Sequence, residues 1–211
     1  DSNHHRILVA SLEGEVARIA GSGEPGFGDG RATSARFAGP QGMALDRESL
    51  YVADTENHAV RRIDLETMEV RTVAGTGKQG HGSREGGEAT ATPLSSPWDV
   101  LVRGRAVMIA MAGYHQLWAL DLDERTVAPW AGSGREDLRD GPPDIACFAQ
   151  PSGLATDGAR LYVADSETSA VRAVDFEDGH TSTLVGRGLF EFGDEDGIGD
   201  DALLQHVLGV C

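Results

Sequence analysis

Three histidines recur at equivalent positions and carry the side chain that most often binds metal ions. His5, His58 and His115 each follow a short stretch of small and polar residues. Imidazole nitrogen binds zinc at about 2.1 Å, so a shared ion would require these side chains to converge. Side chains that occur once per unit around an axis lie too far apart for that. The pattern therefore predicts hydrogen-bonded turn residues and no metal ligands.

Two aspartates resemble catalytic carboxylates, or part of a Ser/His/Asp system. Asp54 and Asp165 are each followed by a hydroxyl residue, Thr55 and Ser166. At a strand end, this combination is typical of side chains that cap a turn. Met111 stands at the same place in a third copy, so the position does not require a carboxylate. We interpret both aspartates as turn-capping residues.

Asp99 is the carboxylate best placed for a functional role. Asp99 lies in a sequence motif that repeats along the chain. The other copies of this motif carry glycine at the equivalent position, namely Gly42, Gly153 and Gly209. Asp99 should lie on a strand that lines a central channel, where it could contact a ligand or ion. The alternative is a hydrogen-bonded role that anchors the neighbouring glycine-rich loop. A metal site needs several converging ligands, and these strands supply only Asp99.

The third copy of the phrase is rich in aromatic side chains. It contains Tyr114, His115 and Trp118, and aromatic residues are favoured at protein interfaces. Trp118 falls at an apolar register and is predicted to pack in the core. Tyr114 lies in a turn, where we expect it to be exposed. The candidate binding-face or channel residues are therefore Trp98, Asp99, Tyr114, His115 and His58.

All these residues belong to one phrase that repeats along the chain. Each copy runs from a Pro-x-Gly or Pro-x-Asp start through an apolar hairpin to a Gly-x-Gly end. The closing glycines are Gly21, Gly75, Gly132 and Gly186, at steps of 54, 57 and 54 residues. The opening strands give steps of 57, 54 and 56 residues. Both landmarks indicate a period near 55 residues, which is typical of a repeat architecture.

Each unit contains about four short runs of β-branched and aromatic residues bounded by turn residues, and no run has a helical period. Four-stranded units repeated around an axis are the blades of a β-propeller. The sequence therefore predicts an all-β fold, a β-propeller with about four units. We expect a partial blade at 1–38, blades at 39–95, 96–149 and 150–203, and the start of another blade at 204–211.

Two motifs identify the repeat. The segments Tyr-Val-Ala-Asp-Thr-Glu-Asn-His at 51–58 and Tyr-Val-Ala-Asp-Ser-Glu at 162–167 resemble the NHL repeat. Further segments are similar to the family of NHL-repeat-containing protein 2 and its bacterial relatives, at 96–100, 109–120, 148–154 and 204–210. This resemblance implies a six-bladed NHL propeller between a thioredoxin-like domain and a small C-terminal β-domain. Only the propeller is represented here, without the redox cysteine motif.

The two ends of the sequence suggest a segment of a larger propeller. Residues 1–7 align with 54–60, so we expect the chain to open inside the second strand of a unit. Residues 204–210 should form the opening strand of a fifth unit. These features favour a truncated six-bladed propeller, as an open arc or one that self-associates through exposed blade edges. A closed four-bladed ring is the alternative.

No segment has the pattern of a signal peptide or of an apolar membrane span. We therefore expect no membrane contact. The cellular location stays unassigned, with the cytoplasm favoured.

The direction of the strands decides which loops share a face of the propeller. The turn 54–58 should lie on the same face as the long links 77–97 and 134–150, which makes this face the better binding candidate. The links carry a second phrase, Asp-Gly followed by small residues and an apolar anchor. We expect the anchors to tuck between blades; they are Phe37, Phe148 and Leu204.

The net charge of −16, from 34 acidic and 18 basic residues, argues against nucleic acid as a partner. The largest basic cluster is the pair Arg61-Arg62. The two cysteines, Cys147 and Cys211, do not form a disulfide framework. Cys147 lies in an apolar run, where we expect a buried and inert thiol.

The sequence favours a non-catalytic scaffold that binds a protein partner. It contains no Gly-x-Ser-x-Gly, zinc, Walker or dinucleotide motif, so we predict no catalytic residue and no cofactor. Whether this chain is an enzyme stays open. One alternative is a metal-dependent hydrolase or lyase with an axial site. Another is a redox function in a missing thioredoxin-like domain.

Overall fold

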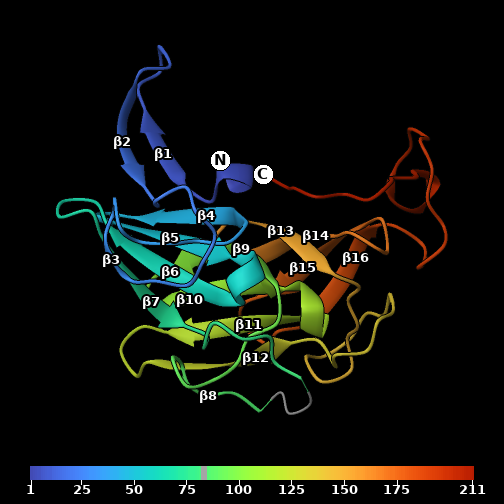
Figure 1. Cartoon of the computed structure of the whole chain (residues 1–211). Coiled ribbons are helices and arrows are strands. Elements are labelled where there is room, and N and C mark those ends of the chain that lie inside the picture. The colour runs from blue at the N-terminus through green and yellow to red at the C-terminus, as the bar shows by residue number, and fades with distance from the viewer. Residues whose placement is uncertain (82–84) are drawn as a thin grey trace.

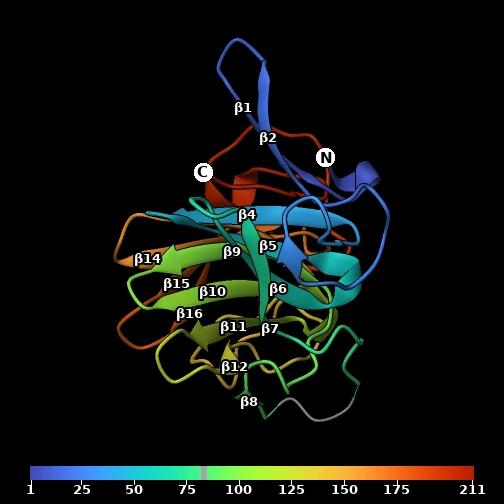
Figure 2. The same ribbon diagram turned by 60° about the vertical axis from the view of Figure 1, so that its left-hand side comes forward.

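The computed structural model describes residues 1–81 and 85–211, in which the strands form four antiparallel sheets. The second, third and fourth sheets follow one another along the chain and pack as blades around a common axis, whereas the hairpin at 7–20 projects from the body (Figures 1 and 2). The predicted all-β propeller fold is thus confirmed. Residues 82–84, which fall within the predicted link 77–97, lie outside the described residues.

The first sheet pairs β1 (Ile7–Ala10) with β2 (Val16–Ala20). The second has the order β3 (Gly30–Arg31), β7 (Glu69–Ala74), β6 (Ala59–Asp64), β5 (Ser49–Asp54) and β4 (Pro40–Asp46). The third has the order β8 (Gly87–Glu88), β12 (Thr126–Ala131), β11 (Gln116–Asp121), β10 (Ala106–Met111) and β9 (Pro97–Arg103). The fourth contains β13 (Pro151–Thr156), β14 (Arg160–Asp165), β15 (Ala170–Asp175) and β16 (Thr181–Val185). Short 3-10 turns complete the elements: η1 (Ser2–His4), η2 (Thr55–Asn57), η3 (Ala112–Tyr114) and η4 (Gly199–Asp201).

The middle strands of the second and third sheets are apolar on both faces because each of these two sheets packs between two neighbours. In β5 and β10 nearly every residue is buried. One apolar cluster joins the second and third sheets, and contains Tyr51, Val60, Val107 and Ile109. Others join the third sheet to the fourth and the first to the second. The core is therefore divided into layers between blades.

The long links cross to the next blade and add a short edge strand there. β3 pairs with β7, and β8 pairs with β12. The apolar anchors of these links are fully buried at Phe37, Leu94 and Phe148, as the sequence predicts for two of them, whereas Leu204 is only half-buried. The predicted blade divisions assign each link to the preceding unit, and these boundaries stay a prediction.

A fully buried arginine ties the link to the second blade. Arg61, on β6, donates from Nη1 to Oδ2 of Asp54 and from Nη2 to Oδ1 of Asp29, each at 2.7 Å. Its guanidinium also donates to the carbonyl oxygens of Arg36 at 2.9 Å and Gly28 at 2.8 Å. One side chain thus joins a strand end to the preceding link.

The fourth blade repeats this arrangement. Arg172, on β15, donates to Oδ2 of Asp165 at 3.2 Å and to Oδ1 of Asp140 at 3.0 Å. Its other acceptors are the carbonyl oxygens of Cys147 at 2.8 Å and Arg139 at 2.9 Å. The Asp-Gly phrase of the links therefore supplies a carboxylate to a buried arginine of the next blade.

The two carboxylates of each network differ in their electrostatics. Burial raises the pKa of Asp54 and of Asp165, against the opposing effect of their arginine partners and backbone amides. Burial also acts to raise the pKa of Asp29 and of Asp140. Hydrogen bonds from threonine and arginine outweigh this effect and hold each pKa below its ordinary value. The link carboxylate is therefore the more firmly ionised partner of the guanidinium.

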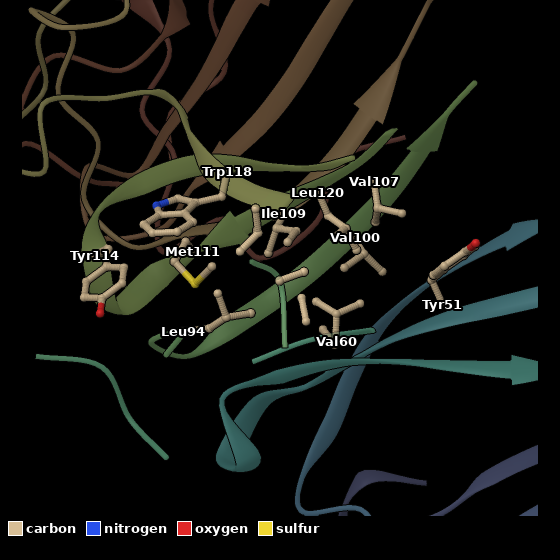
Figure 3. Close-up of a cluster of buried hydrophobic side chains, with 14 residues drawn as sticks. Tyr51, Val60, Leu94, Val100, Val107, Ile109, Met111, Tyr114, Trp118 and Leu120 are labelled. Carbon is tan, nitrogen blue, oxygen red and sulfur yellow. The ribbon is translucent and has the colours of Figure 1, made fainter. Parts of the chain in front are cut away.

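The third blade replaces the whole charged set with apolar residues. Met111 takes the place of Asp54, and Trp118 that of Arg61. Figure 3 shows Met111 beside Trp118 and Leu94 in the buried cluster. The Met111 sulfur accepts the backbone N–H of Ser95 at 3.4 Å. An apolar pair of this kind avoids the desolvation of two charges.

The ends of the chain differ in detail from expectation. The chain begins in the turn η1 and not inside a second strand, so β1 and β2 are the third and fourth strands of their blade. Residues 204–211, all described, form no strand, although they pack along β13. Within the described residues no strand pairing joins them to β1–β2, so the strand pairing that would close a four-bladed ring is not present. Both termini lie at the same end of the molecule (Figures 1 and 2).

In the part of the chain that the structure describes, no helix has the length and apolar character needed to cross a membrane.

The exchange in the third blade predicts how the second blade responds to mutation. Asp54→Met alone should lower the free energy of unfolding by about 3–5 kcal/mol, because it leaves the buried Arg61 with one carboxylate fewer. The triple variant Asp29→Gly, Asp54→Met and Arg61→Trp, which copies the third blade, should lose less than the single variant. Urea denaturation measures both.

Arg71→Met is the matched control, since Arg71 is exposed and its loss should change stability by less than about 0.5 kcal/mol. A triple variant less stable than Asp54→Met would contradict the expectation and show that packing outweighs charge at this position.

Candidate functional site

The first strands of the blades converge on one small cavity, which we call the axial cavity. It has a volume of about 230 Å³ and opens between β4, β9, β13 and the C-terminal segment. Its lining residues are Gln41, Gly42, Trp98, Asp99, Ser152, Gly153, Leu208, Gly209 and Val210. The predicted channel position of Asp99 and of the equivalent glycines is therefore where the structure places them.

A β-bulge explains why consecutive residues reach this cavity. On β9, Pro97 lies opposite Met111 and Asp99 opposite Ala110, so Trp98 is an extra residue in the pairing. The same irregularity occurs near the start of β4 and β13. Alternate residues of a regular strand face opposite sides, and a bulge breaks that alternation. Both Trp98 and Asp99 can thus face the axis.

The carboxylate of Asp99 joins two blades through backbone amides. Oδ1 accepts the N–H of Val100 and Oδ2 accepts that of Leu154, both at 2.8 Å. Leu154 belongs to β13, so the second bond crosses from the third blade to the fourth. Burial raises the pKa of Asp99, and the two amides oppose that effect. The anchoring role considered from the sequence is thus present.

The glycines at the axis are required by close backbone approach. A Cβ on Gly42 would overlap both the carboxylate and the Cα of Asp99. A Cβ on Gly153 would meet the carbonyl oxygen of Leu208 at 2.7 Å. Neighbouring first strands therefore touch at the axis, and this contact limits the width of the axial cavity.

The turn histidines bind the next unit and do not converge. Nδ1 of His5, His58 and His115 accepts a backbone N–H at 3.1, 2.9 and 3.3 Å. The donors are Gly39, Ser96 and Gln150, in that order. In the fourth blade, Ser169 replaces histidine and its hydroxyl accepts the N–H of His206 at 3.1 Å. The prediction of hydrogen-bonded turn residues is confirmed.

The hydroxyl residues of these turns have another role than the one the sequence suggested. Thr55 donates to the carbonyl oxygen of Pro97 at 2.8 Å, and Ser166 donates to that of Val207 at 2.9 Å. The turn η2 has no side-chain cap, because the Asp54 carboxylate is held by Arg61 and neighbouring donors. The interpretation of Asp54 as a turn-capping residue is therefore wrong. These residues fasten one blade to the next.

Two further hollows adjoin the axial cavity on the face that carries the turns, which we call the turn face. One, of about 480 Å³, is lined by Ser2, Asn3, His5, Gly39, Gln41 and Glu56. The other, of about 230 Å³, is lined by Ser96, Trp98, Ala112, Gly113, His115 and Gln150. Gln41 and Trp98 each line two of the three hollows.

The expectation for Tyr114 is wrong. Its side chain is buried, with 3% exposure, and its ring stacks on Trp118 with centroids 5.5 Å apart (Figure 3). The apolar exchange in the third blade creates this pocket for an aromatic ring. Of the five candidate residues, Trp98, Asp99 and His115 line the hollows of the turn face. His58 lies at a seam between blades, and Tyr114 lies in the core.

The sequence interpretation missed the two buried arginines. The available signal was the spacing, since Arg61 and Arg172 each follow the strand-end aspartate by seven residues. It also missed Gln41 and Ser152, which the bulges place at the axial cavity. Cys147 is buried as expected, and Cys211 is exposed. Among residues 1–81 and 85–211, no three His, Cys, Asp or Glu side chains are grouped to hold a metal ion.

Comparison with known proteins identifies the repeat. Residues 37–63 match the model of the NHL repeat family. The whole chain aligns with NHL repeat-containing protein 2 of Homo sapiens at 45% identity, and covers 33% of that protein. It also aligns over its whole length with protein SUPPRESSOR OF QUENCHING 1, chloroplastic, of Arabidopsis thaliana at 45% identity, and covers 21% of it. The chain thus spans a third or less of the curated relatives it matches.

Solved structures with a similar fold are more distant in sequence. A protein of unknown function from Bacteroides thetaiotaomicron has a TM-score of 0.65 and 22% identity, over 82% of this chain and 42% of that chain. A chain of a nidogen/laminin complex has a TM-score of 0.58 and 19% identity, over 87% and 56%. Virginiamycin B lyase from Staphylococcus aureus has a TM-score of 0.54 and 14% identity, over 86% and 49%. These likenesses establish the fold alone.

The close approach at the axis gives a prediction for Gly42. Gly42→Ala should lower the free energy of unfolding by about 1–3 kcal/mol, because the added methyl group meets both the backbone and the carboxylate of Asp99. Removing that carboxylate, in Gly42→Ala/Asp99→Gly, should relieve only part of the loss. A double-mutant cycle from urea unfolding measures the coupling.

Gly188→Ala serves as the control, since a Cβ there meets open space. Equal losses for Gly42→Ala and Gly188→Ala would contradict the close approach of the strands.

The histidine contacts predict which substitutions are tolerated where the turn of one blade meets the next blade. His58→Leu removes the acceptor for the Ser96 amide and should cost about 1–3 kcal/mol. His58→Ser should cost less, because serine makes the equivalent bond in the fourth blade. Hydrogen exchange at the Ser96 amide should accelerate in the leucine variant only. His180→Leu, at an exposed position in the fourth blade, is the comparison variant. Faster exchange of the Ser96 amide in that variant would show that the effect is not local.

Proposed function

We propose that this NHL-repeat segment, which matches NHL repeat-containing protein 2 along its whole length, is a non-catalytic scaffold that binds a protein partner across its turn face. The observation that carries the proposal is the row of three adjoining hollows on that face, joined by Gln41 and Trp98. An extended row of shallow hollows suits a protein surface better than a single small molecule.

The size and composition of the hollows support this proposal. Two of them, at about 230 Å³, are below the roughly 300–1,000 Å³ typical of small-molecule sites. Trp98 is half-buried between them, and half-buried aromatic side chains are enriched at protein interfaces. The backbone beneath is fixed by the seam contacts of the turns, so the face is ready to bind without rearrangement.

The charge of the chain supports a protein partner over nucleic acid. Acidic residues outnumber basic residues by 34 to 18. Two of the arginines, Arg61 and Arg172, are also fully buried in ion pairs. The basic surface that could neutralise phosphates is therefore smaller than the composition suggests.

A metal-dependent hydrolase or lyase is the less favoured alternative. Such a site needs about three protein ligands, and the described residues contain no group of that kind. Asp99 lies at the axis, but both its oxygens accept backbone amides. The likeness to virginiamycin B lyase, at 14% identity, does not carry its activity to this chain.

A redox role would belong to another part of a longer protein. Within this chain Cys147 is buried and hydrogen-bonded to Ser133, and Cys211 is exposed. Neither stands in a Cys-x-x-Cys motif. The scaffold proposal is compatible with a parent whose chemistry lies elsewhere and whose partner is held here.

Site-specific photo-crosslinking in the full-length protein tests the proposal. A photoreactive residue at Gln41, on the turn face, should give a discrete protein adduct in cells of the source organism. The same residue at Glu124, which is exposed in the opposite turn between β11 and β12, should not. Trp98→Ala should remove the adduct, because it empties the centre of the surface.

Mass spectrometry of the adduct identifies the partner. The proposal fails if both positions give the same adducts, or if the Gln41 adduct survives Trp98→Ala unchanged.

A further inference from the structure

We propose that the axial cavity receives one arginine side chain of the partner protein, which pairs with the carboxylate of Asp99 and stacks on the indole of Trp98. This inference rests on the proposed function and specifies the chemistry at its centre. The juxtaposition that carries it is a carboxylate and an aromatic ring, placed side by side by a β-bulge. Among the described residues, the cavity has no other charged lining residue.

Asp99 retains the capacity to bind a cation. A carboxylate has about four acceptor positions, and the two bonds to Val100 and Leu154 use two of them. Among the described residues, no ion pair to Asp99 is formed, whereas Asp54 and Asp165 each face an arginine. Asp99 is therefore a largely buried acid without a counter-charge, and burial raises its pKa. A guanidinium from outside would supply the missing charge.

Trp98 adds the second element of arginine recognition. It lines the axial cavity together with Asp99 and remains half-exposed. A guanidinium over an indole face gains a cation–π attraction, and arginine stacks on aromatic rings more readily than lysine. The same chain binds its own arginines in this way. Arg61 lies over the ring of Phe37 at 5.1 Å while it pairs with Asp54.

The dimensions of the cavity favour one side chain over other occupants. Its volume of about 230 Å³ is small for a cofactor or a drug-sized ligand. A divalent cation would need several oxygen ligands, and Asp99 is the one carboxylate among the described lining residues. The rest of the lining is amide, hydroxyl, glycine and aliphatic. A planar cation on a flexible stem fits this mixture.

Nuclear magnetic resonance titration of the 211-residue chain tests the proposal. The probe is the tripeptide Gly-Arg-Gly, compared with Gly-citrulline-Gly, which has nearly the same shape and no charge. We expect saturable shifts of the Trp98 indole N–H and of the Val100 and Leu154 amides with the arginine peptide. Citrulline should bind on the order of tenfold more weakly, as expected for loss of a charge-assisted hydrogen bond.

Two variants and a matched control make the result specific. Asp99→Asn should abolish the difference between the two peptides, and Trp98→Leu should weaken arginine binding while it leaves the amide bonds of Asp99 in place. Glu124→Gln removes one negative charge from the exposed turn between β11 and β12, on the opposite face, and should change the affinity little. Unchanged amide shifts of β14–β16 verify that the variants are folded.

The proposal is overturned if citrulline binds as well as arginine, or if Glu124→Gln weakens binding as much as Asp99→Asn. It is also overturned if Mg²⁺ saturates the same resonances more tightly than the peptide. None of these outcomes affects the crosslinking result at Gln41, so the scaffold proposal and the arginine proposal can fail separately.

Discussion

The buried guanidinium of Arg61, and its counterpart Arg172, is the interaction on which the rest of the structure depends. Each joins the strand-end aspartate, the link of the preceding unit and the third strand of the blade. The link leads directly into the first strand, so its position sets where that strand meets the axis. In the second and fourth blades, these contacts therefore help to position the first strands that line the axial cavity.

The third blade shows that the same geometry can be reached without charge. Met111 and Trp118 fill the positions of the aspartate and the arginine, and the Met111 sulfur still accepts the amide that a carboxylate accepts elsewhere. A buried ion pair and an apolar pair of similar volume often give a protein similar stability. Removing one partner of the ion pair is destabilising, because it leaves a buried charge without its counter-charge. The exchange also explains why Tyr114 is buried, because Trp118 offers its ring a stacking partner where the second and fourth blades carry a charged arginine.

The fold and the residues at the axis were predictable from the sequence. The repeat period indicates the number and size of the units, and the recurring glycines mark where neighbouring first strands approach closely. The replacement of glycine by Asp99 identified the axial residue on the same basis. The functions of Thr55 and Ser166 were not predictable, since their acceptors lie more than forty residues away. The exposure of Tyr114 was misjudged because it depends on Trp118 in the neighbouring strand, which a turn motif does not report.

The groups that accept hydrogen bonds from each buried arginine all come before that arginine in the sequence. Asp29, Gly28 and Arg36 all precede Arg61 in the chain, and the acceptors of Arg172 likewise precede it. During synthesis, chains fold from the N-terminus as they leave the ribosome. Each guanidinium thus emerges after every group it must bind, and no blade has to wait for a later one to neutralise its buried charge. The order of these residues along the chain therefore suits folding that proceeds from the N-terminus during synthesis.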